Sequence, residues 1–90
     1  MQKQNIGDCV CAIAGHDKDV FYIVIAEDAK YLYLADGVYK TVAHPKKKSK
    51  KHIQLIAAQI LPISTSGYSD LEIKRVLKQL KINNSSKATC

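Results

Sequence analysis

Short apolar runs separated by polar turn residues divide the first part of this chain into pieces of strand length. Residues 9–14 and 20–26 are rich in β-branched and aromatic side chains, as half-buried or buried strands are. Between them, residues 15–19 read Gly-His-Asp-Lys-Asp, which are turn formers. The pattern predicts an antiparallel hairpin with a loop of about five residues, in which Gly15 takes a positive φ.

The following segment, residues 31–35, alternates aromatic with aliphatic side chains and predicts a third strand. The alternation sends Leu32 and Leu34 into the core. It places Tyr31 and Tyr33 together on the opposite face of the strand.

Asp36 and Gly37 come directly after this strand. They predict a two-residue type I′ turn, because this dipeptide accepts the positive φ that the turn needs at both positions. Residues 38–43 are then the expected fourth strand, antiparallel to the third.

A lysine-rich segment, residues 44–52, interrupts the apolar pattern. Pro45 cannot donate to a strand ladder and five close lysines repel one another, so we expect an exposed loop or a sheet edge. Residues 53–60 are apolar again and fit a fifth strand, with a short helix as the alternative. Together these segments predict a mainly β fold, a five-stranded, partly open SH3-like barrel over residues 1–63.

The last third of the chain predicts one C-terminal α-helix. Ser69 and Glu72 have the spacing of a capping box, which satisfies two backbone donors at a helix start. Apolar residues then recur at helical spacing, and we expect this face to pack on the barrel. They are Ile73, Val76, Leu77 and Leu80. Residues 64–82 are therefore read as linker and helix, and residues 83–90 as a disordered tail.

Charge is concentrated in one stretch of the chain. Residues 40–52 contain six lysines and no acid, a local charge of +6 that equals the net charge of all 90 residues. Such a stripe is typical of a surface that binds a polyanion.

Length, hydropathy and cysteine usage bound the class of protein. Ninety residues predict one domain with a modest core. We find no run of about twenty apolar residues and no apolar segment behind the N-terminus, so neither a membrane span nor a signal peptide is expected. Three cysteines without scaffold spacing favour a reducing compartment. The expectation is a cytoplasmic monomer.

The first hairpin resembles the KOW motif, on Gly7-Asp8, Val10, Gly15, Lys18 and Ile23-Val24. Asp19 stands where the second signature glycine of the motif is expected. Residues 34–37, the basic run and residues 51–54 also look like small KOW proteins related to an e-type large-subunit ribosomal protein of archaea and eukaryotes, with short bacterial relatives. The resemblance covers residues 5–82. It implies an SH3-like barrel that binds ribosomal RNA or another structured RNA, possesses no enzymatic activity and has ribosomal proteins as neighbours.

Candidate RNA-binding residues follow from charge and from aromatic exposure. Lysines contact phosphates and gain affinity from released counterions, whereas unpaired bases stack on aromatic rings. Histidines near the lysines add hydrogen-bond donors when protonated. The candidates are Lys40, Lys46, Lys47, Lys48, Lys50, Lys51, His52, His16, Lys18, Tyr31 and Tyr33, with Tyr39 as a further ring that could stack.

Other readings of the same residues stay open. The basic segment could be a solvated loop without a dedicated partner, or the lysines and tyrosines could bind an acidic protein surface, as SH3-like domains can. Binding to anionic lipid would use the same charges, but the sequence has no adjoining apolar anchor.

Metal binding and catalysis have little support in the sequence. Cys9 and Cys11 share one face of a strand, but a second ligand pair is missing, so we read them as small buried side chains. Most acids fall in predicted turns, and the sequence has no phosphate-binding glycine loop and no nucleophile motif. We therefore expect no metal, no cofactor and no enzymatic activity.

Overall fold

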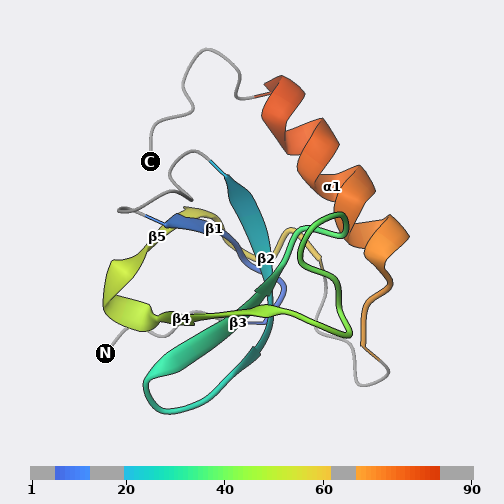
Figure 1. Cartoon of the computed structure of the whole chain (residues 1–90). Coiled ribbons are helices and arrows are strands. Elements are labelled where there is room, and N and C mark those ends of the chain that lie inside the picture. The colour runs from blue at the N-terminus through green and yellow to red at the C-terminus, as the bar shows by residue number, and fades with distance from the viewer. Residues whose placement is uncertain (1–5, 13–19, 62–66, 84–90) are drawn as a thin grey trace.

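The computed structural model describes residues 6–12, 20–61 and 67–83, and the structural statements below concern those residues. It contains five strands, one short 3-10 helix and one α-helix (Figure 1). The elements are β1 (Cys9–Ala12), β2 (Phe21–Glu27), β3 (Tyr31–Ala35), β4 (Lys46–Ser49), η1 (Lys50–His52), β5 (Ile53–Ala57) and α1 (Asp70–Asn83).

The five strands form one antiparallel sheet in the order β4-β3-β2-β1-β5. Consecutive strands pair from β1 to β4, after which η1 turns the chain across to β5, which pairs with β1 (Figure 1). β4 and β5 are the two edges and do not pair with each other, so the sheet is not closed. The predicted mainly β fold with five strands and one C-terminal helix is confirmed. The antiparallel pairing of the first two strands is also confirmed, whereas the predicted loop between them lies outside the described residues.

Apolar side chains are buried on both faces of this sheet. Because successive residues of a strand point to opposite faces, Phe21 and Ile23 of β2 lie on one side and Val24 on the other. Phe21 and Ile23 belong to the first apolar cluster, which also contains Ile73 and Leu77 of α1, so the helix packs on that face. The second cluster comprises Val10, Tyr22, Val24, Leu32 and Leu34. Leu32 and Leu34 are fully buried, as predicted.

The segment after β3 differs from the prediction. Residues 38–43 are not a strand, and the fourth strand is the lysine segment Lys46–Ser49. Asp36 explains the difference, because its Oδ1 accepts backbone hydrogen bonds from Val38, Tyr39 and Lys40, each at 2.9 Å. These N–H groups are therefore not available to pair with a neighbouring strand. Asp side chains often accept backbone hydrogen bonds in turns in this way. Asp36 and Gly37 therefore open a long loop instead of a two-residue hairpin turn.

The Gly-Asp pair before β1 has a structural role. Gly7 has φ +99°, and a Cβ on it would overlap the Leu61 carbonyl oxygen. The buried carboxylate of Asp8 accepts a hydrogen bond from the Gln59 N–H at 2.8 Å. These contacts tie the start of β1 to the chain after β5, which ends at Ala57, earlier than the expected residue 60.

The capping box at the start of α1 is confirmed. Ser69 Oγ accepts a hydrogen bond from the Glu72 N–H at 3.1 Å, and Glu72 Oε1 accepts one from the Ser69 N–H at 3.3 Å. Ile73 and Leu77 are buried against the sheet, as their spacing predicts. The helix continues to Asn83, one residue beyond the expected boundary, and residues 84–90 lie outside the described part of the chain. In the described segments, α1 is too short and too polar to cross a membrane.

Candidate nucleic-acid interface

β4 and η1 carry five lysines, here called the lysine strip: Lys46, Lys47, Lys48, Lys50 and Lys51. The sequence left open whether this segment is a loop or a sheet edge. β4 is an edge strand, hydrogen-bonded to β3 on one side. A lysine-rich edge is also a common way to prevent further strand pairing, so its position does not by itself assign a partner.

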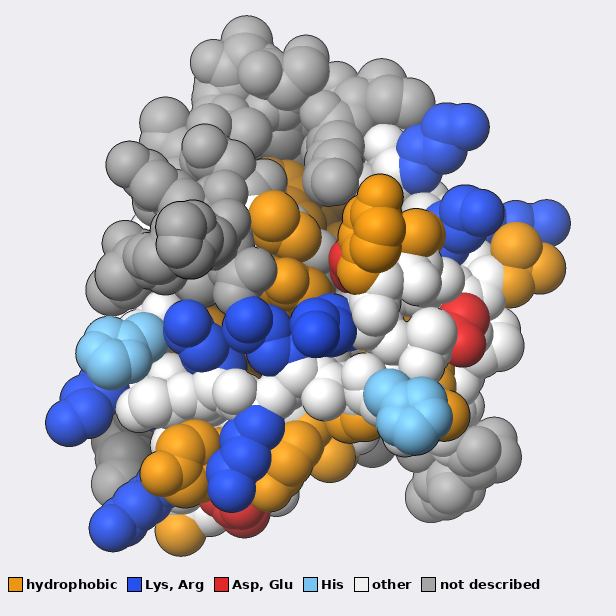
Figure 2. Space-filling view, in the orientation of Figure 1, with side chains coloured by type: hydrophobic (Ala, Val, Ile, Leu, Met, Phe, Trp, Pro, Cys, Tyr) orange, Lys and Arg blue, Asp and Glu red, His pale blue; other side chains and the backbone are white. Residues whose placement is uncertain are grey.

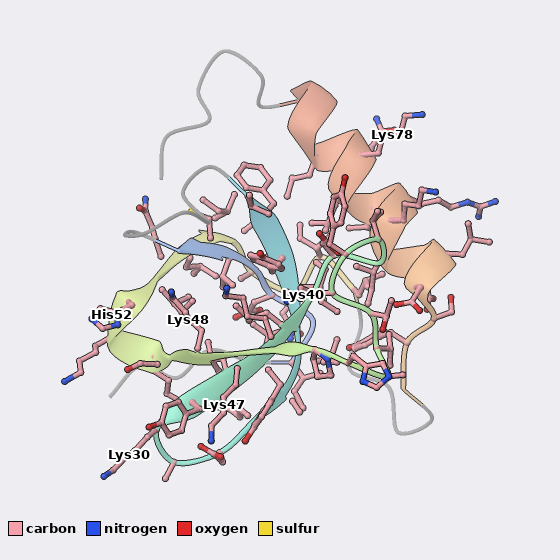
Figure 3. All side chains as sticks on the ribbon, viewed as in Figure 1. Lys30, Lys40, Lys47, Lys48, His52 and Lys78 are labelled. Carbon is pink, nitrogen blue, oxygen red and sulfur yellow. The ribbon has the colours of Figure 1, made fainter. Side chains whose placement is uncertain are left out.

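The pairing register divides the strip between two faces of the sheet. Lys46 lies opposite Leu34 and Lys48 opposite Leu32, whereas Lys47 lies opposite Tyr33. Since opposed residues of antiparallel strands share a face, Lys46 and Lys48 belong to the side of the second apolar cluster. Figure 3 shows Lys47 and Lys48 extending to opposite sides of β4.

On the side of Lys48, basic groups form a row across the molecule. Figure 2 shows lysine or arginine side chains side by side between apolar patches, and Figure 3 places Lys48 and Lys40 at this level. Lys40 comes from the loop after β3 and is half-buried. Residues from the predicted basic stretch are thus brought together by tertiary structure as well as by sequence.

On the other side, the Lys47 ammonium lies 4.4 Å from the centroid of the Tyr31 ring. This is a cation–π contact, worth about 0.5–1 kcal/mol where it is exposed. Tyr31 is 37% exposed. The predicted pairing of Tyr31 and Tyr33 on one face is correct, and Lys47 joins them there.

Tyr31 also borders a pocket of about 500 Å³ between the β2–β3 turn and η1. We call it the Tyr31 pocket; it is lined by Lys30, Tyr31, Ser49, Lys50 and Lys51. The lining comprises one tyrosine, one serine and three lysines, and no acid. A nucleic-acid base could stack on the Tyr31 ring, and phosphates could contact the lysine ammonium groups of the pocket.

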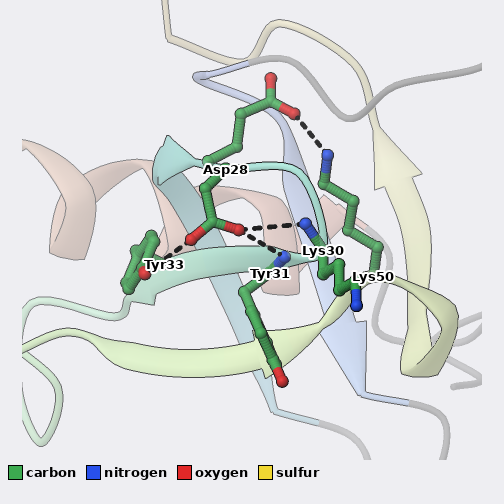
Figure 4. A network of polar contacts seen from close by, with 6 residues as sticks. Asp28, Lys30, Tyr31, Tyr33 and Lys50 are labelled. Carbon is green, nitrogen blue, oxygen red and sulfur yellow. Dashed lines mark hydrogen bonds and ion pairs between the residues drawn. The ribbon is translucent and has the colours of Figure 1, made fainter.

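Asp28 holds the turn that carries Lys30 and Tyr31 (Figure 4). Its Oδ1 accepts hydrogen bonds from the N–H groups of Lys30 at 3.0 Å and Tyr31 at 2.9 Å, and its Oδ2 accepts one from the Tyr33 hydroxyl at 3.0 Å. The Tyr31 N–H, followed by that of Lys30, lowers the pKa of Asp28 below its ordinary value. The hydrogen bond to Asp28 raises the pKa of Tyr33. Tyr33 is therefore part of the support of the site, and its hydroxyl is already engaged.

Lys50 differs from the other lysines of the strip. Its Nζ forms an ion pair with Glu27 Oε2 at 3.1 Å, and its backbone N–H donates to the Lys30 carbonyl oxygen at 3.0 Å. Glu27 Oε2 is a buried oxygen, and this ion pair compensates for its charge. Lys50 thus fastens η1 to the β2–β3 turn, and its charge is already balanced.

The remaining predicted residues have different outcomes. Lys51 and His52 are both exposed on η1. Lys51 lines the Tyr31 pocket, and His52 is the residue that follows it in the chain. His16 and Lys18 lie outside the described residues, as does Gly15 with its expected positive φ. Sequence reasoning missed Lys30, because this lysine stands alone between Asp28 and Tyr31 and lies far from the basic run in the chain.

The cysteines do not form a site in the described residues. Cys9 and Cys11 are fully buried in the cluster beneath α1, in agreement with the interpretation of small buried side chains. Cys11 is disulfide-bonded, which the sequence analysis did not predict, whereas Cys9 is not in a disulfide. Within residues 6–12, 20–61 and 67–83, no three His, Cys, Asp or Glu side chains are grouped as a metal site would need.

No protein-family model matches this sequence, and a search of curated proteins found no match either.

Proposed function

We propose that this protein binds RNA, with the phosphates on the lysine strip and an unpaired base in the Tyr31 pocket. The observation that carries the proposal is the composition of that pocket, in which Lys30, Ser49 and Lys51 line one tyrosine beside Lys50, whose charge is paired with Glu27. A polyanion with planar groups meets both requirements of this surface. Lys30 precedes Tyr31, which the sequence analysis predicted as an RNA-binding residue, and we add Lys30 to the RNA-binding residues in this proposal.

Structured RNA, and ribosomal RNA in particular, is the partner that we favour. The resemblance of the first hairpin and of residues 34–37 and 51–54 to small KOW proteins supports this choice. So does the topology, since five short antiparallel strands with β5 returning to β1 fit a partly open SH3-like barrel. We infer a cytoplasmic, ribosome-associated protein without enzymatic activity, active as a monomer with ribosomal proteins as neighbours.

The strip should contact phosphates through four lysines, because Lys50 is paired with Glu27. If Lys46, Lys47, Lys48 and Lys51 each neutralise one phosphate, log K should fall against log salt with a slope of about −2.8 on single strands and about −3.6 on duplex. Raising salt from about 50 to 200 mM should then weaken binding roughly 50- to 150-fold. The contacts are to phosphate, so unrelated RNA sequences should give similar slopes.

Titration of labelled ribosomal RNA fragments at several salt concentrations tests the proposal. Replacing Lys47, Lys48 and Lys51 together by Ala should flatten the slope by about two units on single strands. Lys48→Ala alone should flatten it by about 0.7, whereas Arg75→Ala removes the same charge from an exposed position of α1 and should leave it nearly unchanged. Wild-type affinity and slope in the triple variant would contradict the proposal.

Tyr31 separates RNA binding from the alternative of an acidic protein partner. Tyr31→Ala should weaken binding of unpaired RNA about 5- to 150-fold and leave the salt slope unchanged, because stacking releases no counterions. Tyr31→Phe keeps the ring and should bind like the wild type. A protein that prefers acidic peptides over RNA in the same titrations would favour the SH3-like interaction module instead.

A further inference from the structure

A second concave surface lies between the loop after β3 and α1. This Tyr39 groove has a volume of about 280 Å³ and is lined by Asp36, Val38, Tyr39, Lys74, Leu77 and Lys78. Its volume is near the lower limit for small-ligand pockets, about 300 Å³. It therefore suits one planar group rather than a large ligand.

The loop side of the groove is built rigidly. Asp36 Oδ1 holds three successive N–H groups, including that of Tyr39, at 2.9 Å. Gly37 is packed so closely on α1 that a Cβ would overlap the Asp70 carbonyl oxygen. Further along the loop, the Val42 N–H donates to Asp70 Oδ1 at 2.8 Å. The groove is thus preorganised before any ligand binds.

This rigid loop leaves an aromatic side chain in water. Tyr39 is 86% exposed and Val38 is 52% exposed, whereas Leu77, which also lines the groove, is buried. Single exposed apolar residues need no explanation in proteins. Here, however, the ring stands beside Lys74 and Lys78, which are one turn apart on the same face of α1.

The groove is continuous with the row of lysines on the face of Lys48. Lys40 directly follows Tyr39 in the loop, and Figure 3 shows Lys48, Lys40 and Lys78 in succession from η1 to α1. In Figure 2 the row of basic side chains leads to an apolar patch with further basic side chains beyond it. One extended polyanion can therefore contact the strip and the groove.

We infer that the Tyr39 groove binds a second unpaired nucleotide of the same RNA, with its base stacked on Tyr39 and its flanking phosphates on Lys74 and Lys78. This inference rests on the proposed function and adds α1 to the RNA-binding surface. Charge complementarity decides for RNA over an apolar peptide, because two lysines, Lys74 and Lys78, line the groove together with the ring. Asp36 is an acid in the groove lining and would repel an anion. Its Oδ1 already accepts hydrogen bonds from three backbone N–H groups, and this reduces the repulsion.

The test uses the whole chain and a labelled oligouridylate long enough to cover both surfaces, with a hairpin RNA as the base-paired comparison. Tyr39→Ala should weaken oligouridylate binding about 5- to 150-fold at an unchanged salt slope, and Tyr39→Phe should restore it. Replacing Lys74 and Lys78 together by Ala should flatten the slope by about 1.4. Arg75→Ala, on α1 but outside the groove lining, is the matched control.

The outcomes separate the two proposals. If Tyr39→Ala binds oligouridylate within twofold of the wild type while the Lys47, Lys48 and Lys51 variant is weakened, the Tyr39 groove does not bind RNA but the lysine strip does. If Tyr39→Ala weakens binding of the hairpin RNA as much as binding of oligouridylate, the proposed stacking of an unpaired base on Tyr39 is wrong. A wild-type protein that binds neither RNA overturns both proposals. Thermal melts of each variant exclude unfolding, which is not expected for a side chain as exposed as Tyr39.

Discussion

The hydroxyl of Tyr33 donates a hydrogen bond to Asp28 Oδ2 at 3.0 Å, while the other carboxylate oxygen holds the backbone of the β2–β3 turn. One carboxylate therefore connects β3 to the turn that presents Lys30 and Tyr31. The pKa of Asp28 is lowered chiefly by the backbone N–H groups of Tyr31 and Lys30 and less by the Tyr33 hydroxyl, whereas the hydrogen bond to Asp28 raises the pKa of Tyr33.

The first prediction is a pH dependence of this link. Because the pKa of folded Asp28 lies below its ordinary value of 3.8, its stabilisation is complete above that pH and is lost as pH falls through the folded pKa. For Tyr33 the raised pKa gives stabilisation that is complete below its ordinary value of 10.0 and is lost at higher pH. The stability difference between wild type and Asp28→Ala should thus be constant at intermediate pH and shrink in acid. Unfolding curves at a series of pH values measure it.

A spectroscopic titration checks the same link independently. In Asp28→Ala the pKa of Tyr33 should return toward its ordinary value, so phenolate absorbance should rise at lower pH than in the wild type. Tyr33→Phe removes this tyrosine and serves as the control. Superimposable phenolate titrations of wild type and Asp28→Ala would show that the hydrogen bond does not persist in solution.

The second prediction concerns the ion pair between Glu27 and Lys50. Glu27→Gln should strengthen RNA binding and steepen the salt slope by about 0.7 on single strands, because Lys50 then becomes available to a phosphate. Lys50→Ala in the wild-type background should change the slope less than Lys48→Ala does. If Lys50→Ala and Lys48→Ala flatten the slope equally, Lys50 already contacts RNA in spite of Glu27.

The third prediction concerns the packing of Gly37 on α1. Gly37→Val should destabilise the fold by more than about 1 kcal/mol, since φ is +81° and the new Cβ would meet the Asp70 carbonyl oxygen. Gly67→Val is the matched control, because Gly67 has φ +87° and a Cβ added there would have no atom within 4 Å. Gly67→Val therefore introduces the backbone strain of a positive φ without a steric clash. Thermal melts that shift equally for both variants would mean that the loop does not rest on the helix.

The fourth prediction concerns the docking of α1. Leu77→Ala should cost about 2–5 kcal/mol, because Leu77 is buried in the first apolar cluster. Leu71→Ala, on the same helix but 61% exposed, should stay within about 0.5 kcal/mol of the wild type. Denaturant unfolding compares the two. A negligible cost for Leu77→Ala would show that the helix is not docked in solution.

Local patterns were sufficient for much of the fold. The alternation in β3, the capping box of Ser69 and Glu72, and the helical spacing of Ile73 and Leu77 each appear in the structure as predicted. These predictions are correct because each feature depends on residues within a few positions of one another. The prediction for residues 38–43 failed because one Asp36 oxygen binds three nearby N–H groups, a choice that the apolar pattern does not reveal.

The sequence by itself determined that a dense run of lysines follows the third strand, and that tyrosines occur before it. Only the tertiary structure decided how these charges are used. Pairing of β4 with β3 sends alternate lysines to opposite faces, and the turn beside η1 brings Glu27 to Lys50. Packing of the loop on α1 places Tyr39 beside Lys74 and Lys78. Such contacts join residues far apart in the chain, so their geometry depends on the completed fold and not on local preference.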